Sequence, residues 1–349
     1  MKRTIASLIV ASVLAVAESP PVASQTPIVV SYQPSVYWAL PFHYANVKGW
    51  WKDVGLSPSF VAFPAGAPQI AASASNSWDV GATGSVPAVL GAVRFNILTI
   101  GITSDESKIN AMMVVGSKFD AIKANPAQLK GQRLLLTTNS TVDFAARKCL
   151  VKFGLAPTDM QFVNLGQAQI VSALVSNNGD IAGVWAPNTY TLEERAGAKY
   201  LCTAADAGAV VPVALIVRAD FAKERPDDVA KFLAVYLRGL SWANANPAEA
   251  RALGLEFYKQ GGLEVSPRAM DQEFALRTTF GLDEQLKIMA RAANASTVDG
   301  WFTELGKFIT EVGTIPANPN VQDYIKDDFM KRVAADPKLR AFATEFDKK

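Results

Sequence analysis

The sequence predicts an α/β protein of two lobes, each a mainly parallel sheet flanked by helices, with a helical C-terminal segment. Short apolar runs typical of strands alternate with helical patterns, and the strands fall into two groups, before about Val115 and after about Arg133. From Arg225 onward the pattern is helical. Repeated strand–helix units favour parallel sheets, and a chain of 349 residues is long enough for about two domains.

The first group of elements begins with a β-branched strand at 28–31 and a helix at 38–54, which has Pro41 in its first turn. Ser85 opens a helix over 86–93, with Pro87 in its first turn. The other strands of this group are predicted at 59–63, 80–83, 96–102 and 111–115, and a small-residue helix at 67–75.

The second group follows Asn125-Pro126, which has the residue types of a helix start. Its strands are predicted at 133–137, 161–165, 181–185, 199–202 and 211–217, and its helices at 140–153, 167–176 and 189–196. The helical tail has breaks at Asn246-Pro247, Ser266-Pro267 and Asp336-Pro337. The apolar faces of these helices must pack against a core formed by earlier elements, and the simplest expectation is the core of the first lobe.

Residues 1–24 have the layout of a signal peptide. Lys2 and Arg3 precede an uncharged apolar run over 5–17, and small residues follow at 22–24. The run is too short for a permanent membrane anchor, and a buried N-terminal helix rarely shows this three-part order. We therefore expect cleavage near Ser24 and export to the periplasm.

The composition argues against several classes of function. There are 34 Lys and Arg against 32 Asp and Glu, with no block of like charge, so nucleic acid is not an expected partner. One His (His43) and two Cys give no basis for a His/Cys metal site. In this exported chain, Cys149 and Cys202 are compatible both with a disulfide and with two buried free thiols.

Catalytic motifs are mostly missing from the sequence. It contains no Gly-x-Ser-x-Gly elbow, no phosphate-binding loop and no Gly-x-Gly-x-x-Gly. We expect no cofactor and no catalytic residue, and an exported α/β protein without such motifs fits a binding protein better than an enzyme.

Two turns between a strand and a helix share one design. They lie in VGATGSVPAVL, around Gly84 and Ser85, and in LLLTTNSTVDF, around Asn139, Ser140 and Thr141. Each places backbone N–H groups, hydroxyls and the positive end of a helix at the carboxyl edge of a strand, where open α/β sheets bind ligands. Each turn taken alone is also explained as an ordinary helix N-cap. The pair predicts a site for an anionic head group.

Aromatic residues follow two of the predicted strands. Trp185 ends a strand and is followed by Pro187 and Asn188, and a second group consists of Tyr32, Gln33 and Trp38. A large aromatic at such a position can line a pocket, although packing in a core is the usual role of Trp.

The mature chain resembles the periplasmic substrate-binding proteins of ABC importers for taurine, alkanesulfonates and nitrate. The resemblance is clearest in three segments: GATGSVPAVL, FVNLGQAQIVSALVSNNGDIAGVWAPNTYTLEE and GTIPANPNVQDYIKDDFM. It implies a type II periplasmic-binding fold, with the ligand in a cleft between two lobes joined by two crossings. Lobe one would comprise 25–113 and 213–349, and lobe two 114–212.

Carried onto this sequence, the resemblance implies ligand contacts from both lobes. Asn110 matches a position where taurine-binding relatives carry an acidic residue, and its neutral side chain argues against taurine itself. The implied binding residues are Tyr32, Gln33, Trp38, Gly84, Ser85, Asn110, Asn139, Ser140, Thr141, Trp185, Pro187 and Asn188.

The expected partners are a small-molecule ligand and an ABC permease in the inner membrane, with the protein itself a monomer. Two other functions are compatible with this fold. One is an enzyme of thiamin-pyrimidine or menaquinone synthesis, of which the former, as a family, uses histidines and a cysteine-rich stretch that are absent here. The other is a ligand sensor that docks on a membrane receptor.

Overall fold

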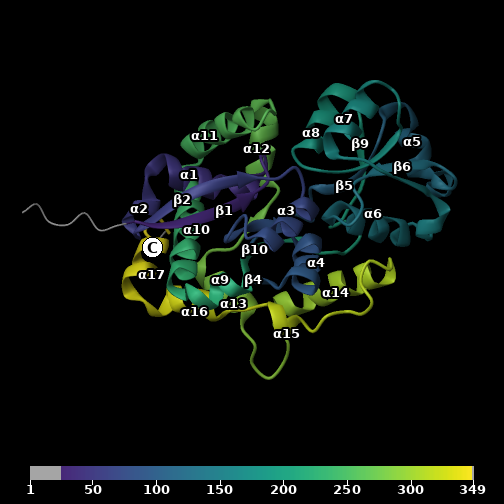
Figure 1. Cartoon of the computed structure of the whole chain (residues 1–349). Coiled ribbons are helices and arrows are strands. Elements are labelled where there is room, and N and C mark those ends of the chain that lie inside the picture. Colours follow the sequence, from purple (N-terminus) through teal and green to yellow (C-terminus); the bar gives the residue numbers. More distant parts are fainter. Residues whose placement is uncertain (1–24, 348–349) are drawn as a thin grey trace, which may run out of the picture.

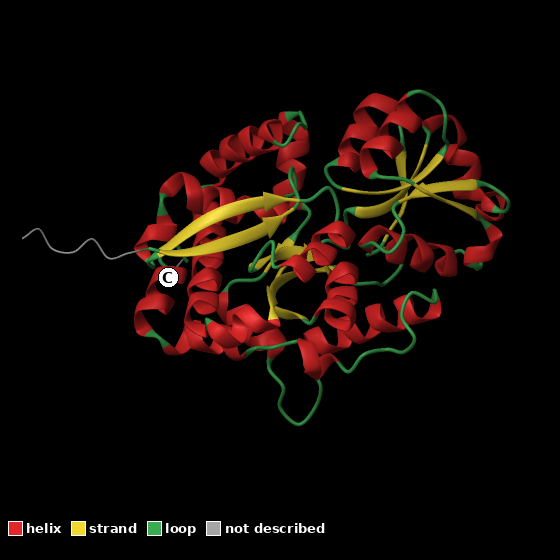
Figure 2. Ribbon diagram, in the orientation of Figure 1, coloured by secondary structure: helices red, strands yellow, loops and turns green. Residues whose placement is uncertain are grey.

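A computed structural model describes residues 25–347 and shows two sheets, each flanked by helices (Figures 1 and 2). The predicted α/β class with a helical C-terminal region is confirmed. The middle of the chain, drawn in teal in Figure 1, forms one body, and the two ends of the chain together form the other. The signal peptide predicted at 1–24 lies outside the described residues.

The first sheet has six strands in the order β11-β4-β10-β3-β1-β2. Its strands are β1 (Thr26–Tyr32), β2 (Leu56–Ala62), β3 (Val80–Gly84), β4 (Ile97–Asp105), β10 (Pro212–Arg218) and β11 (Thr278–Thr279). Strands β1, β2 and β3 are parallel, whereas β10 is antiparallel to both β3 and β4. Strand β10 alternates between two cores: Val213 and Leu215 pack on one face of the sheet, and Ala214 and Ile216 on the other.

The second sheet has five strands in the order β7-β6-β8-β5-β9. Its strands are β5 (Asn110–Val114), β6 (Arg133–Leu136), β7 (Gln161–Asn164), β8 (Ile181–Trp185) and β9 (Lys199–Thr203). The strand expected at 111–115 was grouped with the first sheet, but it forms β5 and pairs with β8 and β9. Pairing partners more than 60 residues away decide which sheet a strand joins, so local pattern could not reveal it. The lobe boundaries at 113/114 and 212/213 stay a prediction.

Helices cover both faces of each sheet. Those of the first third of the chain are η1 (Tyr37–Ala39), α1 (Leu40–Lys48), α2 (Trp50–Asp53), α3 (Gly66–Ala72), η2 (Ser73–Ser75) and α4 (Ser85–Phe95). The helix predicted over 38–54 is divided because Gly49 adopts a left-handed conformation (φ 74°) between α1 and α2. The middle third contributes α5 (Gly116–Ala124), η3 (Pro126–Leu129), α6 (Thr141–Lys152), η4 (Pro157–Asp159), α7 (Gln167–Val175) and α8 (Asn188–Ala196).

The C-terminal segment is helical apart from the short strand β11. Its helices are α9 (Ala219–Glu224), α10 (Pro226–Ala245), α11 (Pro247–Gln260), α12 (Pro267–Ala275), α13 (Leu282–Met289), α14 (Thr297–Glu311), α15 (Val321–Tyr324), α16 (Asp328–Ala335) and α17 (Pro337–Ala343). Phe232 of α10 and Met330 of α16 share a core with Ile28 of β1, so the tail covers the first sheet. Within 25–347, no helix combines the length and the apolar character needed to cross a membrane.

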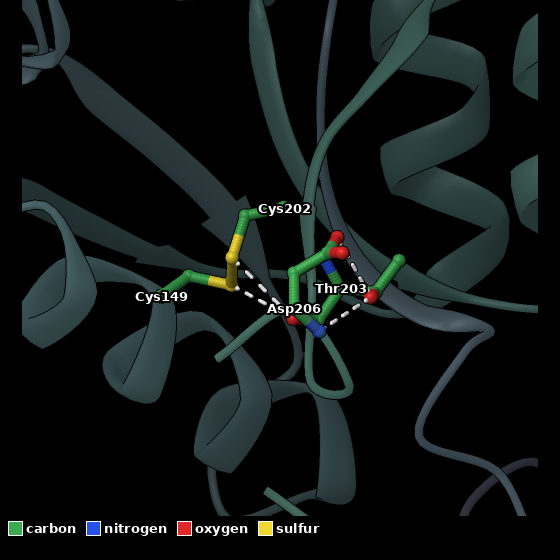
Figure 3. The surroundings of a disulfide bond; sticks show 4 residues. All are labelled: Cys149, Cys202, Thr203 and Asp206. Atoms are coloured by element: carbon green, nitrogen blue, oxygen red, sulfur yellow. Dashed lines mark hydrogen bonds between the residues drawn. A yellow bond between two sulfur atoms is a disulfide. The ribbon is translucent and has the colours of Figure 1, made fainter. Parts of the chain in front are cut away.

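A disulfide joins Cys149 of α6 to Cys202 of β9, which decides between the two states that the sequence left open (Figure 3). The cysteines are 53 residues apart, and both are buried in the core on one face of the second sheet. Figure 3 also shows the turn that ends β9, where the Thr203 backbone N–H and hydroxyl both donate to the Asp206 carboxylate. The bond fixes one helix and one edge strand of the second sheet to each other.

The double variant Cys149→Ser/Cys202→Ser should lose about 2–4 kcal/mol of unfolding free energy, because an open loop of this length gains conformational freedom when the chain unfolds. Urea titration followed by circular dichroism measures the loss. Reduced wild-type protein is the control and should match the variant. Equal stability of the oxidised and reduced wild-type protein would contradict a stabilising disulfide.

Candidate functional site

A small cavity of about 50 Å³ lies where the two sheets and their crossing segments meet. Both bodies contribute to its wall, since Gly84 ends β3 in the first sheet and Thr141 begins α6 beside the second. The residues lining it are Gln33, Val36, Trp38, Ala65, Gly66, Ala67, Gly84, Pro87, Glu106, Asn110, Thr137, Thr138, Asn139, Ser140, Thr141, Trp185, Ala186 and Val213. The cavity is therefore an interlobe site.

The N-termini of helices α4 and α6 approach each other across this cavity. A Cβ atom built on Gly84 would lie 3.0 Å from Cγ2 of Thr141, so a side chain at 84 would have to push Thr141 back by a few tenths of an ångström. No side chain caps α4, and its third residue, Pro87, has no N–H. The first N–H groups of a helix lack partners within the helix and carry its positive partial charge. Both helix starts are therefore suited to an anion.

Ser140 serves as the N-cap of α6. Its hydroxyl accepts a hydrogen bond from the Asp143 N–H at 3.4 Å and donates to the Thr137 carbonyl at 2.6 Å. The hydroxyl is thus engaged with the protein, and what Ser140 and Thr141 offer to the cavity is mainly backbone. The neighbouring Asn139 lies in the left-handed region (φ 56°), and its Oδ1 accepts from the Thr314 hydroxyl at 2.7 Å.

Amide side chains hold the wall of the cavity in place. Thr141 donates to Oδ1 of Asn110 at 2.9 Å, and Nδ2 of Asn110 donates to the Glu106 carbonyl at 3.0 Å. On the opposite side, Nε2 of Gln33 donates to Gln69 at 3.0 Å and to Thr83 at 3.3 Å. These groups are buried or nearly so, which fixes the shape of the cavity before any ligand enters.

The one charged residue in this lining, Glu106, is paired with a buried arginine. Nε of Arg277 lies 2.6 Å from the Glu106 carboxylate, and Nη1 of Arg277 lies 3.1 Å from the carboxylate of Glu273. Burial lowers the pKa of Arg277, but the two carboxylates raise it, and it ends well above its ordinary value. Burial raises the pKa of Glu273, which Arg277 opposes. Because Arg277 contacts the Glu106 carboxylate directly, it offsets part of the negative charge that Glu106 brings to the cavity.

A second, wider cavity of about 320 Å³ adjoins the first. The two share Gln33, Val36 and Trp185 in their linings. Pro187, which follows Ala186 through a cis peptide bond, and Asn188 line the wider cavity. We call the two the inner and the outer cavity.

Gln167, the first residue of α7, connects three segments of this wall. Its Nε2 donates to the Thr137 hydroxyl at 3.2 Å and to the Gly183 carbonyl at 3.5 Å. Its Oε1 accepts from the Trp185 N–H and from Nδ2 of Asn188, both at 3.4 Å. All four hydrogen-bonding positions of the amide are therefore used.

The structure brings most of the predicted site residues together. Those in the inner cavity are Gln33, Trp38, Gly84, Asn110, Asn139, Ser140, Thr141 and Trp185. Pro187 and Asn188 lie in the outer cavity. Tyr32 and Ser85 line neither cavity.

Tyr32 and Ser85 lie outside both cavities for simple physical reasons. Successive residues of an extended segment face opposite sides, so Tyr32 points away when Gln33 faces the cleft. Tyr32 instead lines a separate cavity of about 160 Å³ with Phe60, His43 and Phe257. Ser85 has no exposed surface, and the cavity wall at this turn is formed by Gly84.

Several lining residues escaped the sequence analysis. Gly66 begins α3 after β2, and Gln167 begins α7 after β7, so both repeat the strand-to-helix design already recognised at Gly84 and Ser140. That pattern was a usable signal. No comparable sequence pattern marks Glu106 or Val213. Both lie near the segments that cross between the two sheets, and they reach the cavity only because of how the two sheets are placed.

The two bodies also touch beside the cavity, between α6 and α14. Phe144 of α6 is 2% exposed and belongs to a core of the first sheet, with its ring centroid 5.3 Å from that of Phe308. Lys148 and Glu304 form an ion pair at 3.6 Å next to it. Figure 1 shows α14 running beneath α6. We refer to these contacts, together with that of Thr314 on Asn139, as the α6–α14 interface.

Fold and site together define an α/β protein of the type II periplasmic-binding architecture, with two sheets and a cavity between them. The chain belongs to the NMT1/THI5-like family, whose model matches residues 39–250.

Two curated relatives cover most of the chain. The taurine-binding periplasmic protein of Escherichia coli (strain K12) is 27% identical, over 87% of this chain and 92% of the relative. A protein of Brucella abortus (strain 2308), named only as a binding protein, is 25% identical over 88% of this chain and 92% of its own length.

Solved structures show the same fold. The periplasmic aliphatic sulphonate binding protein SsuA from Escherichia coli has a TM-score of 0.71 at 18% identity, covering 88% of this chain and 100% of that one. The desulfurization enzyme DSZB has a TM-score of 0.61 at 15% identity, covering 89% and 99%. The fold is thus shared by binding proteins and an enzyme.

The variant Arg277→Met should lose about 3–5 kcal/mol of unfolding free energy at pH 7, because Glu106 and Glu273 are left buried without a counter-charge. Without Arg277, burial should hold the pKa of Glu273 in the folded protein well above its value in the unfolded protein. The folded state would then hold protons more strongly, so the loss should shrink as the pH falls toward 5 and grow as it rises. Urea titrations at both pH values measure this.

Arg251→Met is the matched control, because Arg251 pairs with the exposed Asp271 at 2.8 Å. A surface pair of this kind contributes about 0–1 kcal/mol. A loss for Arg277→Met no larger than that of the control, or one that does not change with pH, would contradict the role given to Arg277.

Proposed function

We propose that the protein is an exported solute-binding protein that captures a small organic anion, above all a sulfonate, and delivers it to an ABC permease. The observation that carries the proposal is the approach of two helix N-termini, at Gly84 and Thr141, across the inner cavity. A sulfonate, with three oxygens that accept hydrogen bonds, matches N–H groups converging from two sides. The taurine- and sulphonate-binding names of the relatives support this ligand class.

The chemistry of the inner cavity favours binding over catalysis. Its lining residues include no His, Cys or Lys, and the carboxylate of Glu106 is held by Arg277. His43 lies in the separate cavity with Tyr32. The wall offers hydrogen-bond donors in fixed positions and no activated nucleophile with a base beside it.

In the proposed mechanism the ligand stabilises a closed arrangement of two lobes, 25–113 with 213–349 and 114–212. Opening would separate Phe144 from Phe308 and uncover both helix starts. A ligand that contacts both lobes favours the closed form by its difference in affinity for the two forms. Micromolar binding corresponds to about −8 kcal/mol, part of which is used in closure. The closed shape would be recognised by the permease in the inner membrane, with the binding protein a periplasmic monomer.

Isothermal titration calorimetry of the chain without residues 1–24 tests the proposal. The ligands are ethanesulfonate, taurine, nitrate and benzoate. We expect a sulfonate to bind at one site, and mass spectrometry of the released ligand to find it unchanged. Absence of binding by every anion, or conversion of a bound sulfonate to product, would overturn the proposed function.

Gly84→Ala should weaken ethanesulfonate binding about tenfold, equivalent to about 1.4 kcal/mol, because the added methyl group would press against Thr141 in the closed form. The melting temperature should stay within a few degrees, since φ of Gly84 is −58° and any residue adopts it. Calorimetry and thermal unfolding measure the two effects.

Gly300→Ala is the control, because a Cβ at Gly300 in α14 meets nothing within 4 Å. An unchanged affinity for Gly84→Ala would show that the two helix starts do not close on the ligand.

A further inference from the structure

We infer that the cleft is built for an organic sulfonate whose body is at least as large as one ring and mostly apolar, rather than for a two-carbon sulfonate. The inference rests on the proposed function and specifies its substrate class. It follows from the unequal sizes of the two adjoining cavities and from the residues that line the larger one.

The inner cavity is large enough for a head group only. The inner cavity has a volume of about 50 Å³, and one buried water needs roughly 10–15 Å³. The inner cavity therefore matches a group of a few heavy atoms, such as a sulfonate. Because its polar wall is fixed by the hydrogen bonds of Gln33 and Asn110, it has little freedom to widen.

The outer cavity, of about 320 Å³, falls within the range of sites for larger ligands, roughly 300–1,000 Å³. A cavity of about 150 Å³ already admits a benzene molecule. The two cavities lie side by side, because Gln33, Val36 and Trp185 line both. A ligand with its head in the inner cavity therefore has its body in the outer one, beside Trp185.

The lining of the outer cavity is suited to an apolar body. Its apolar members include Pro34, Pro64, Val171, Trp185, Pro187 and Leu263. The amide of Gln167 is already saturated by four hydrogen bonds. Arg195 is the one charged residue in this lining, so an ammonium group on the body finds no carboxylate there. A short ligand such as ethanesulfonate would leave most of this volume to water.

The test compares ethanesulfonate with benzenesulfonate by calorimetry, on the wild-type chain and on two variants of α7. Ala168 is exposed and lines the outer cavity, so Ala168→Trp fills that cavity without disturbing a core. Ser172→Trp is the matched control, because Ser172 is exposed on the same helix but lines neither cavity. Thermal unfolding confirms that both variants fold.

In the wild-type chain, benzenesulfonate should bind at least tenfold more tightly than ethanesulfonate. Ala168→Trp should remove most of this difference while leaving ethanesulfonate within twofold, and Ser172→Trp should change neither. Equal affinities of the two ligands in the wild-type chain, or equal behaviour of the two variants, would overturn this inference and leave the proposed function standing. Failure of both sulfonates to bind, together with taurine, nitrate and benzoate, would instead overturn the proposed function itself.

Discussion

The close approach of two helix starts, at Gly84 and at Thr141, is the constraint on which the rest of the site depends. Each helix N-terminus carries about half a positive elementary charge, so two of them facing one cavity repel each other weakly. An anion between them turns this repulsion into attraction on both sides. The ligand's charge would therefore add to that of Asp143, the acidic residue in the first turn of α6, whose carboxylate accepts from the Asn139 N–H.

The α6–α14 interface compensates for that repulsion with apolar contact. Phe144 extends from the second body into a core of the first and packs against Phe308, and an aromatic pair of this kind contributes about 0.5–1.5 kcal/mol beyond its buried area. This apolar contact opposes the repulsion between the partly screened helix ends. Small differences in ligand contact can then decide between open and closed forms, which is what a protein that must both capture and release its ligand requires.

Most of the fold and much of the site follow from local sequence pattern, because a helix start after a strand can be recognised from a few adjacent residues. This pattern predicts Gly84, Asn139 and Ser140, which line the inner cavity, and Gly66 and Gln167 repeat it. Tyr32 lines a separate cavity because its neighbour Gln33 takes the face toward the cleft. Strand β5, whose position in the chain predicted the first sheet, joins the second because its pairing partners lie far along the chain. Glu106 and Arg277 are 171 residues apart, and only the folded structure brings their charges together.

The pairing of Glu106 with Arg277 explains how an acidic residue can line a site for anions. A buried arginine placed directly in the cavity would bind any anion strongly and with little regard to its body. Here the side chain of Arg277 is fully buried behind Glu106. Its charge is paired with the carboxylates of Glu106 and Glu273. The inner cavity is left with oriented N–H groups and amides, whose energy depends steeply on distance and angle. Discrimination between ligands would then rest on the fit of the head group and on the volume available to the body, and not on net charge alone.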